Sequence, residues 1–202
     1  MWNHLLRTFI GFALLFTGTA GAADLIEAPE GTSAPTAELI AMPEELAEMA
    51  DWAISLFDQA GLDLPPLRFV HHNGDLDVCG GRPGLHRRVD GVNVIEICTN
   101  DASAATEVLM LHETAHAWAD HALTAERRDE FQQLRGWEHW RNHGETAWHD
   151  NGTEQAAEIM VWGLIDRPIG MIRIHQASCA DLDAGYRTLT GQAPLHGFTD
   201  YC

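Results

Sequence analysis

The feature that most constrains this chain is the motif His112-Glu113-Thr114-Ala115-His116. It lies in residues 104–121, a stretch that is predicted to form one helix. Residues four apart on a helix lie on the same face, one turn from each other, so both imidazoles can bind one metal ion. Glu113 is then close enough to take a proton from a water molecule beside that ion. The motif therefore predicts a helix with two metal ligands and a carboxylate base.

The alternative is a helix with two surface histidines and an incidental glutamate, since the chain contains twelve histidines. The flanks of the motif favour burial instead. Apolar residues 108–111 precede it, and Ala117 and Trp118 follow it. A helix that enters the core of a domain needs such an apolar surface.

A third ligand is expected downstream, because a catalytic zinc ion commonly has three protein ligands and one water molecule. The candidates lie in a predicted helix over residues 153–164, where Thr153 follows the turn-forming run 150–152 and is the expected N-cap. Glu154 and Glu158 are four residues apart and share one face of this helix. Either carboxylate could complete the site.

These two segments resemble the zincin metallopeptidases, and among them the gluzincins, which pair the motif with a downstream helical glutamate. The resemblance implies that His112, His116 and Glu154 bind one zinc ion per chain and that Glu113 is the general base. The order of the two acids favours Glu154 over Glu158 as the ligand. Glu158 would instead accept a hydrogen bond from a ligand histidine and fix its tautomer.

The resemblance also implies a fold and a function. The expected fold is α+β and zincin-like, with a small antiparallel or mixed sheet packed on the motif helix and further helices toward the C-terminus. A metzincin is excluded because Ala122 stands where that group has its third histidine. The expected function is zinc-dependent hydrolysis of a peptide or protein substrate. Three alternatives stay open: a zincin-like binding module that cuts nothing, a zinc amidase with a non-peptide substrate, and a metal-free exported structural protein.

Such a hydrolase also needs a donor that stabilises the oxyanion of the transition state. His149 and Arg141 are candidates because they lie in a histidine- and tryptophan-rich segment, residues 136–149, between the two metal-binding segments. Tyr186, in a helix predicted over residues 180–189, is another candidate.

The N-terminus has the pattern of an export signal. Arg7 precedes an apolar run over residues 9–16, and small residues at 20–22 offer a cleavage site, so residues 1–23 are predicted to be a signal peptide. The apolar run is short for a membrane anchor. Residues 24–42 are predicted to be a linker, and residues 43–202 a single zincin-like domain. The mature protein is expected in the periplasm or outside the cell, with no membrane attachment.

The four cysteines fit this compartment. Three pairings are possible, and we expect Cys79–Cys98 and Cys179–Cys202 because each closes a local loop. Cys79 and Cys98 bracket a predicted β-hairpin. No Cys-x-x-Cys spacing exists, which argues against a structural zinc site of that type.

The formal net charge is −18, and the chain has no lysine. An acidic surface of this kind argues against nucleic acids and anionic membranes as partners. It mildly favours cationic substrates, or serves solubility alone. The sequence does not indicate an oligomeric state.

The remaining elements follow from periodicity and turn residues. A helix is predicted after Pro43, at its N1 position, and ends at Gly61. Strands are predicted at residues 67–70 and 92–98, separated by a polar, glycine-rich stretch over residues 71–90 whose histidines, His86 among them, are expected to be solvated. The second strand is expected to line the cleft and to pair with an extended peptide substrate. A further helix is predicted from a Thr124 cap to about Arg135.

Overall fold

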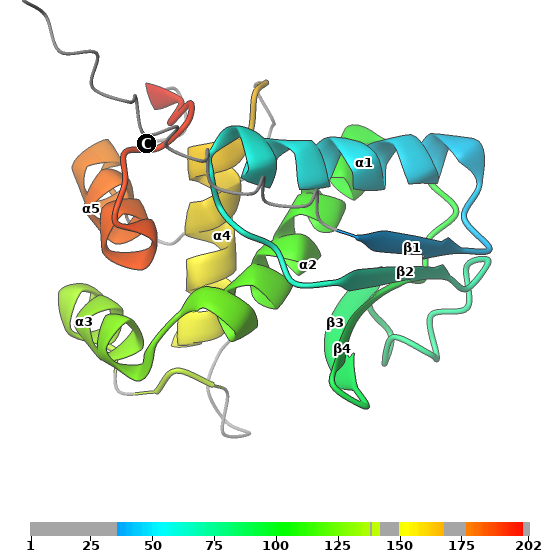
Figure 1. Cartoon of the computed structure of the whole chain (residues 1–202), viewed down its shortest axis with the longest axis horizontal. Helices are drawn as coiled ribbons and strands as arrows, with labels where there is room; N and C mark the ends of the chain where they lie inside the picture. The colour runs from blue at the N-terminus through cyan, green and yellow to red at the C-terminus, as the bar shows by residue number, and fades with distance from the viewer. Residues whose placement is uncertain (1–35, 138, 142–149, 168–176, 200–202) are drawn as a thin grey trace, which may run out of the picture. The chain divides into compact units, whose positions relative to one another are not determined.

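The computed structural model describes residues 36–137, 139–141, 150–167 and 177–199, which contain a small mixed sheet and five α-helices (Figure 1). The α+β class is therefore confirmed. Along the chain the elements are β1 (Ala37–Ile40), α1 (Glu44–Gln59), β2 (Leu67–His71), β3 (Gly84–Val89), β4 (Val92–Ile97), α2 (Ala104–Ala122), α3 (Ala125–Arg135), α4 (Gly152–Leu164) and α5 (Cys179–Thr190). No helix in these described ranges is long and apolar enough to cross a bilayer.

The sheet has the strand order β1-β2-β4-β3. Strands β1, β2 and β4 are parallel, and β3 runs antiparallel to β4 at the end of the sheet. In β2, Leu67 and Phe69 are buried, while Arg68 and Val70 are half buried. Ile95 and Ile97 of β4 have no exposed surface. These side chains form the core together with apolar residues of α1, α2 and α4.

Strand β1 lies inside the segment predicted to be a linker. Ala37 to Ile40 pair in parallel with Leu67 to Val70 of β2, so the predicted domain boundary at residue 43 is too late. Three of its four residues are apolar, but the strand is short, and Glu38 and Leu39 are exposed. Its conformation comes from pairing with β2, which periodicity cannot indicate.

Strand β3 corrects the expectation that residues 71–90 form only a polar stretch. It joins β4 through Asp90 and Gly91, both at positive φ (49° and 84°), the backbone that a two-residue hairpin turn requires. The predicted hairpin between the first two cysteines is confirmed, and the Cys79–Cys98 disulfide is present. Cys202 lies outside the described residues, and with it the predicted pairing to Cys179.

Helices α2 and α4 lie side by side (Figure 1). Helix α4 is buried along almost its whole length, with only Thr153 and Glu154 half exposed. Its C-terminal half packs on α5 through Gly163, where an added Cβ would lie 2.1 Å from the ring of Tyr186. Glycine at this position therefore allows α4 and α5 to pack closely.

The N-caps of three helices can be compared with the residues predicted to start them. Thr124 caps α3 as predicted, because its side chain accepts a hydrogen bond from the Arg127 amide. The cap of α4 is Asn151 and not Thr153: the Asn151 side chain accepts from the Thr153 amide at 3.2 Å. Pro43 was predicted at N1, the first position of α1, but it occupies the N-cap. The helix therefore begins one residue later than predicted, at Glu44.

Candidate metal centre and cleft

The motif residues lie on α2 where it faces both the sheet and α4. Residues Met110 to Ala115 are all buried, His112 at 8% and Glu113 at 7% exposure, which excludes the alternative of two surface histidines. The helix buries polar groups here, and such burial is stable only when each group has a partner. The partners come from α4 and β3.

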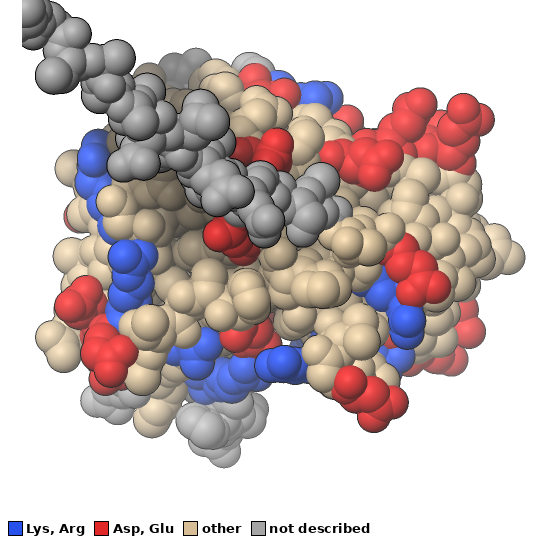
Figure 2. Space-filling model, viewed as in Figure 1, with Lys and Arg blue, Asp and Glu red and all other residues tan. Residues whose placement is uncertain are grey.

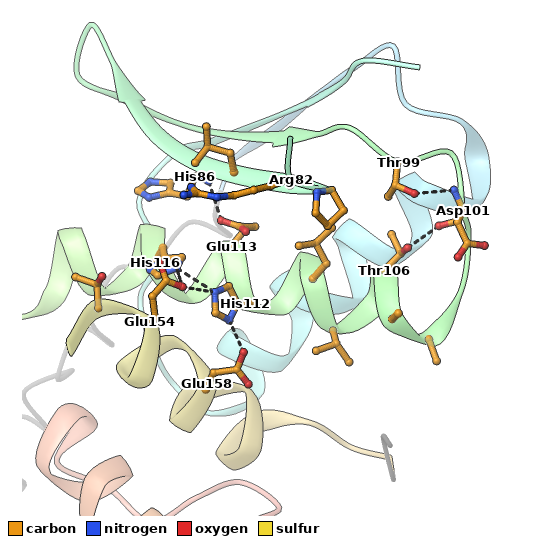
Figure 3. A pocket seen from close by; sticks show the side chains of 18 of the residues that line it. Arg82, His86, Thr99, Asp101, Thr106, His112, Glu113, His116, Glu154 and Glu158 are labelled. Atoms are coloured by element: carbon orange, nitrogen blue, oxygen red, sulfur yellow. Dashed lines mark hydrogen bonds and ion pairs between the residues drawn. The ribbon is translucent and has the colours of Figure 1, made fainter. Parts of the chain in front are cut away.

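The two histidines and Glu154 meet at one point (Figure 3). The Nε2 atoms of His112 and His116 are 3.1 Å apart, and they lie 3.1 Å and 3.3 Å from Oε2 of Glu154. The three potential ligand atoms therefore form a nearly equilateral triangle. His112, His116 and Glu154 form a group that could hold a metal ion.

The dimensions and donor types of this triangle suit a tetrahedral ion. Bonds of about 2.0–2.1 Å from zinc to nitrogen and oxygen place neighbouring ligand atoms about 3.3 Å from each other. The observed separations of 3.1–3.3 Å are close to that value. Two imidazoles and one carboxylate are also a donor set that zinc accepts, with a fourth position left for water or substrate.

Glu158 supports His112 from the other side of its ring. Oε1 of Glu158 lies 3.2 Å from Nδ1 of His112, while Nε2 of the same ring faces Glu154. Glu158 is one helical turn beyond Glu154, so a single face of α4 supplies both contacts. A carboxylate at Nδ1 selects the tautomer that leaves Nε2 free to bind a metal.

The electrostatics favour a positive charge at this point. Burial opposes charge on His112, but hydrogen bonds with Glu154 and Glu158 and the charge of Glu113 raise its pKa to about 10. Burial likewise opposes charge on Glu154, yet hydrogen bonds with His112 and His116 lower its pKa well below the usual value. Both shifts have one cause, which is that two carboxylates face two imidazoles away from solvent.

Glu113 is held at the mouth of this site by β3. Its Oε2 accepts a hydrogen bond from the backbone amide of His86 at 2.7 Å. In Figure 3 the Glu113 carboxylate lies between α2 and β3, whereas the His112 ring points toward Glu154 and Glu158 of α4. The edge strand of the sheet thus fixes the orientation of the candidate base.

His86 is a site residue that the sequence did not indicate. Its ring stacks on that of His116, with centroids 6.3 Å apart, and its Nε2 lies 3.1 Å from Oδ1 of Asn93. Burial lowers the pKa of His86, and the positive field of His116 adds to this, while the bond to Asn93 opposes it. The only signal in the sequence was the Asp90-Gly91 turn, which places His86 at a defined register opposite β4.

A cleft of about 760 Å³ runs along α2 past these residues. One wall is α2, and the other is β3 with the residues just before it. Strand β4, which the sequence predicted at the cleft, lies between β2 and β3 inside the sheet. The strand at the cleft is therefore β3. It was missed because strand order depends on pairing between distant segments and not on local pattern.

The candidate oxyanion donors Tyr186 and Arg141 lie in different parts of the structure. Tyr186 packs against Gly163 in the core, is 1% exposed and does not line the cleft; burial raises its pKa to about 12. Arg141 does line the cleft, where it forms an ion pair with Asp120 at 2.7 Å. His149 lies outside the described residues.

Comparisons of the chain with protein-family models, with curated proteins and with solved structures found no match. The function is therefore inferred from the geometry of the site.

Proposed function

We propose that the protein is an exported, zinc-dependent peptidase whose metal is held by His112, His116 and Glu154. The observation that carries the proposal is the triangle of ligand atoms with Glu113 beside it in an open cleft. A purely structural zinc site is closed by four protein ligands. Here three potential ligands face a cleft, which is the arrangement a catalytic site needs.

A bound zinc ion would lower the pKa of a water molecule and polarise the substrate carbonyl. Glu113 takes a proton from the attacking water and later gives it to the leaving amine. The His86 amide keeps the Glu113 carboxylate turned toward the cleft during both transfers. Glu158 orients His112 through Nδ1.

The edge position of β3 favours an extended peptide as the substrate. An edge strand has backbone groups without a neighbouring strand, and an extended peptide can pair with them. Because β3 forms one wall of the cleft, a peptide paired with it would pass the metal ligands. This favours a peptidase over the amidase alternative. The Cys79–Cys98 disulfide supports export, because disulfides persist in oxidising compartments.

The test combines metal analysis with hydrolysis of a peptide pool by the mature protein. Wild type is expected to contain one zinc ion per chain and to cleave peptides in a chelator-sensitive way. The Glu113→Gln variant should keep its zinc and lose hydrolysis, whereas Glu154→Ala should lose both. The Glu130→Gln variant, which changes an exposed glutamate on α3, is the control and should resemble wild type.

Each alternative gives a different result. Full zinc content with no cleavage of any peptide would favour the binding module, and cleavage of non-peptide amides alone would favour the amidase. A Glu154→Ala variant with full zinc content would remove Glu154 from the ligand set. Wild-type protein without metal would refute the proposal.

A further inference from the structure

A second hollow, of about 500 Å³, lies beside the cleft and is rich in arginine. Its walls come from β3, the end of α2, the start of α3 and the segment that follows α3. The lining residues are His86, Arg87, Arg88, Asp120, Arg128 and Arg141. His86, Asp120 and Arg141 also line the cleft of the candidate metal centre, so the two spaces adjoin.

This concentration of positive charge is unusual for the chain. Four of its twelve basic residues line the hollow, although the formal net charge is −18. In Figure 2 blue side chains form a band across the lower part of the face, between the region of α3 and the β3–β4 hairpin. The four arginines come from three separate segments of the chain, β3, α3 and the segment after α3, so the fold gathers them.

Two of the four charges are neutralised within the protein. Arg141 pairs with Asp120, and Arg87 pairs with Glu96 of β4. Arg88 and Arg128 form no ion pair within the described part of the chain. The Arg88 Nε donates only to the Gly91 carbonyl, at 3.4 Å.

Arg128 is held in place by neutral groups. Its Nη2 donates to the Ala119 carbonyl at 3.3 Å, and its guanidinium lies 5.6 Å from the centre of the Trp140 ring. Its Nε is buried and has no hydrogen-bond partner among the described residues. The hollow therefore retains two arginine charges that no carboxylate of the described residues neutralises, and an anionic group could pair with them.

The hollow lies close to the metal ligands. Asp120 follows His116 by four residues on α2, which is one helical turn of about 5.4 Å. An extended peptide advances about 3.3 Å per residue. A side chain that reaches the hollow therefore belongs to a residue about two positions from the bond next to the metal.

We propose that this arginine hollow binds a carboxylate of the substrate, so that the enzyme prefers peptides with an acidic side chain about two residues from the cleaved bond. The inference rests on the proposed peptidase function. The opposite end of the cleft has an apolar surface from Ala104, Ala105, Val108 and Leu109. The preferred peptide is thus acidic on one side of the cleaved bond and apolar on the other. The acidic remainder of the surface does not cancel this preference, because salt screens charges beyond about 8 Å.

The experiment uses blocked octapeptides that carry Glu, Gln or Lys at one position, which is scanned along the peptide. Cleavage rates are measured with zinc-loaded wild type, and dissociation constants with the zinc-loaded Glu113→Gln variant. We expect kcat/KM and affinity to be about fivefold higher for Glu than for Gln at one position, and lowest for Lys. The preference should decrease as salt is raised.

Arg88 is the residue to change, because its single long hydrogen bond contributes little to the fold. The Arg88→Gln variant should reduce the Glu-to-Gln ratio to near one, and Arg88→Glu should favour the Lys peptide. The control is Arg187→Gln on α5, which removes the same charge from an exposed arginine away from both spaces and should keep the wild-type ratio. Peptides with a free C-terminus and no Glu show whether a terminal carboxylate serves equally well.

The outcomes separate the two proposals. If peptides are cleaved but Glu and Gln are equivalent at every position, the arginine inference is wrong and the peptidase stands. If the Glu peptide binds more tightly and Arg88→Gln abolishes the difference, but nothing is cleaved, the carboxylate site stands and the peptidase proposal fails. If only peptides with a free C-terminal carboxylate are preferred, the group that binds in the arginine hollow is the chain end and not an acidic side chain. An unchanged ratio in Arg88→Gln would overturn the assignment.

Discussion

The role of Glu158 can be tested by the Glu158→Gln substitution. This change removes the negative charge next to Nδ1 of His112 and keeps the length and volume of the side chain. Outer carboxylates of this kind typically contribute a factor of about 10–100 to metal affinity. The contact distance of 3.2 Å is longer than the 2.7–2.9 Å of a strong charge-assisted hydrogen bond, so we expect the lower end, about tenfold. That factor corresponds to about 1.4 kcal/mol of binding free energy.

The assay is competition for zinc against a chromophoric chelator of known affinity at neutral pH. The control is Glu130→Gln, an exposed α3 position with the same loss of charge, whose zinc affinity should equal that of wild type. An affinity of Glu158→Gln within twofold of wild type would refute the orienting role. A complete loss of zinc, as expected for Glu154→Ala, would make Glu158 the ligand, which is the assignment that the sequence left open.

Two further predictions concern stability. Gly163→Ala should destabilise the protein by about 3 kcal/mol, because overpacking against the buried Tyr186 ring outweighs the gain of about 1 kcal/mol in helix propensity. The expected fall in Tm is about 6–12 °C by circular dichroism, and an unchanged Tm would contradict the 2.1 Å approach. The second prediction concerns chelator-treated protein. Burial lowers the pKa of His112, but hydrogen bonds with Glu154 and Glu158 outweigh burial and raise this pKa from its unfolded value of 6.5 to about 10. The stabilisation by charged His112 is fully present below about pH 6.5 and is lost as the pH rises toward 10. The free energy of unfolding, measured with urea, should therefore fall over that range. A constant free energy of unfolding would contradict the coupling between His112 and the two carboxylates.

The candidate metal ligands were predictable because the relevant patterns are local. His112 and His116 are four residues apart on a helix, as are Glu154 and Glu158, and a spacing of four decides which side chains share a face. The cap of α3 at Thr124 and the Cys79–Cys98 pair were also predictable, because each depends on neighbouring residues or a short loop.

Errors arose where pairing between strands decides the structure. Strand β1 has only four residues and lies in the segment taken for a linker, and it exists because β2 offers it hydrogen bonds. The placement of β3, rather than β4, at the cleft depends on strand order, which no local pattern contains. Tyr186 was misplaced for a related reason, since its direction depends on how α5 packs against Gly163.

By itself the sequence determined which residues could be ligands and base, because helical spacing and side-chain chemistry are properties of short segments. Only the tertiary structure decided that Glu154 meets His112 across 42 residues and that the His86 amide holds Glu113 across 27. It alone also gathered the four arginines beside the cleft. The physical reason is that such contacts depend on the packing of whole elements against a common core, and their geometry is set by burial and strand pairing far from the motif.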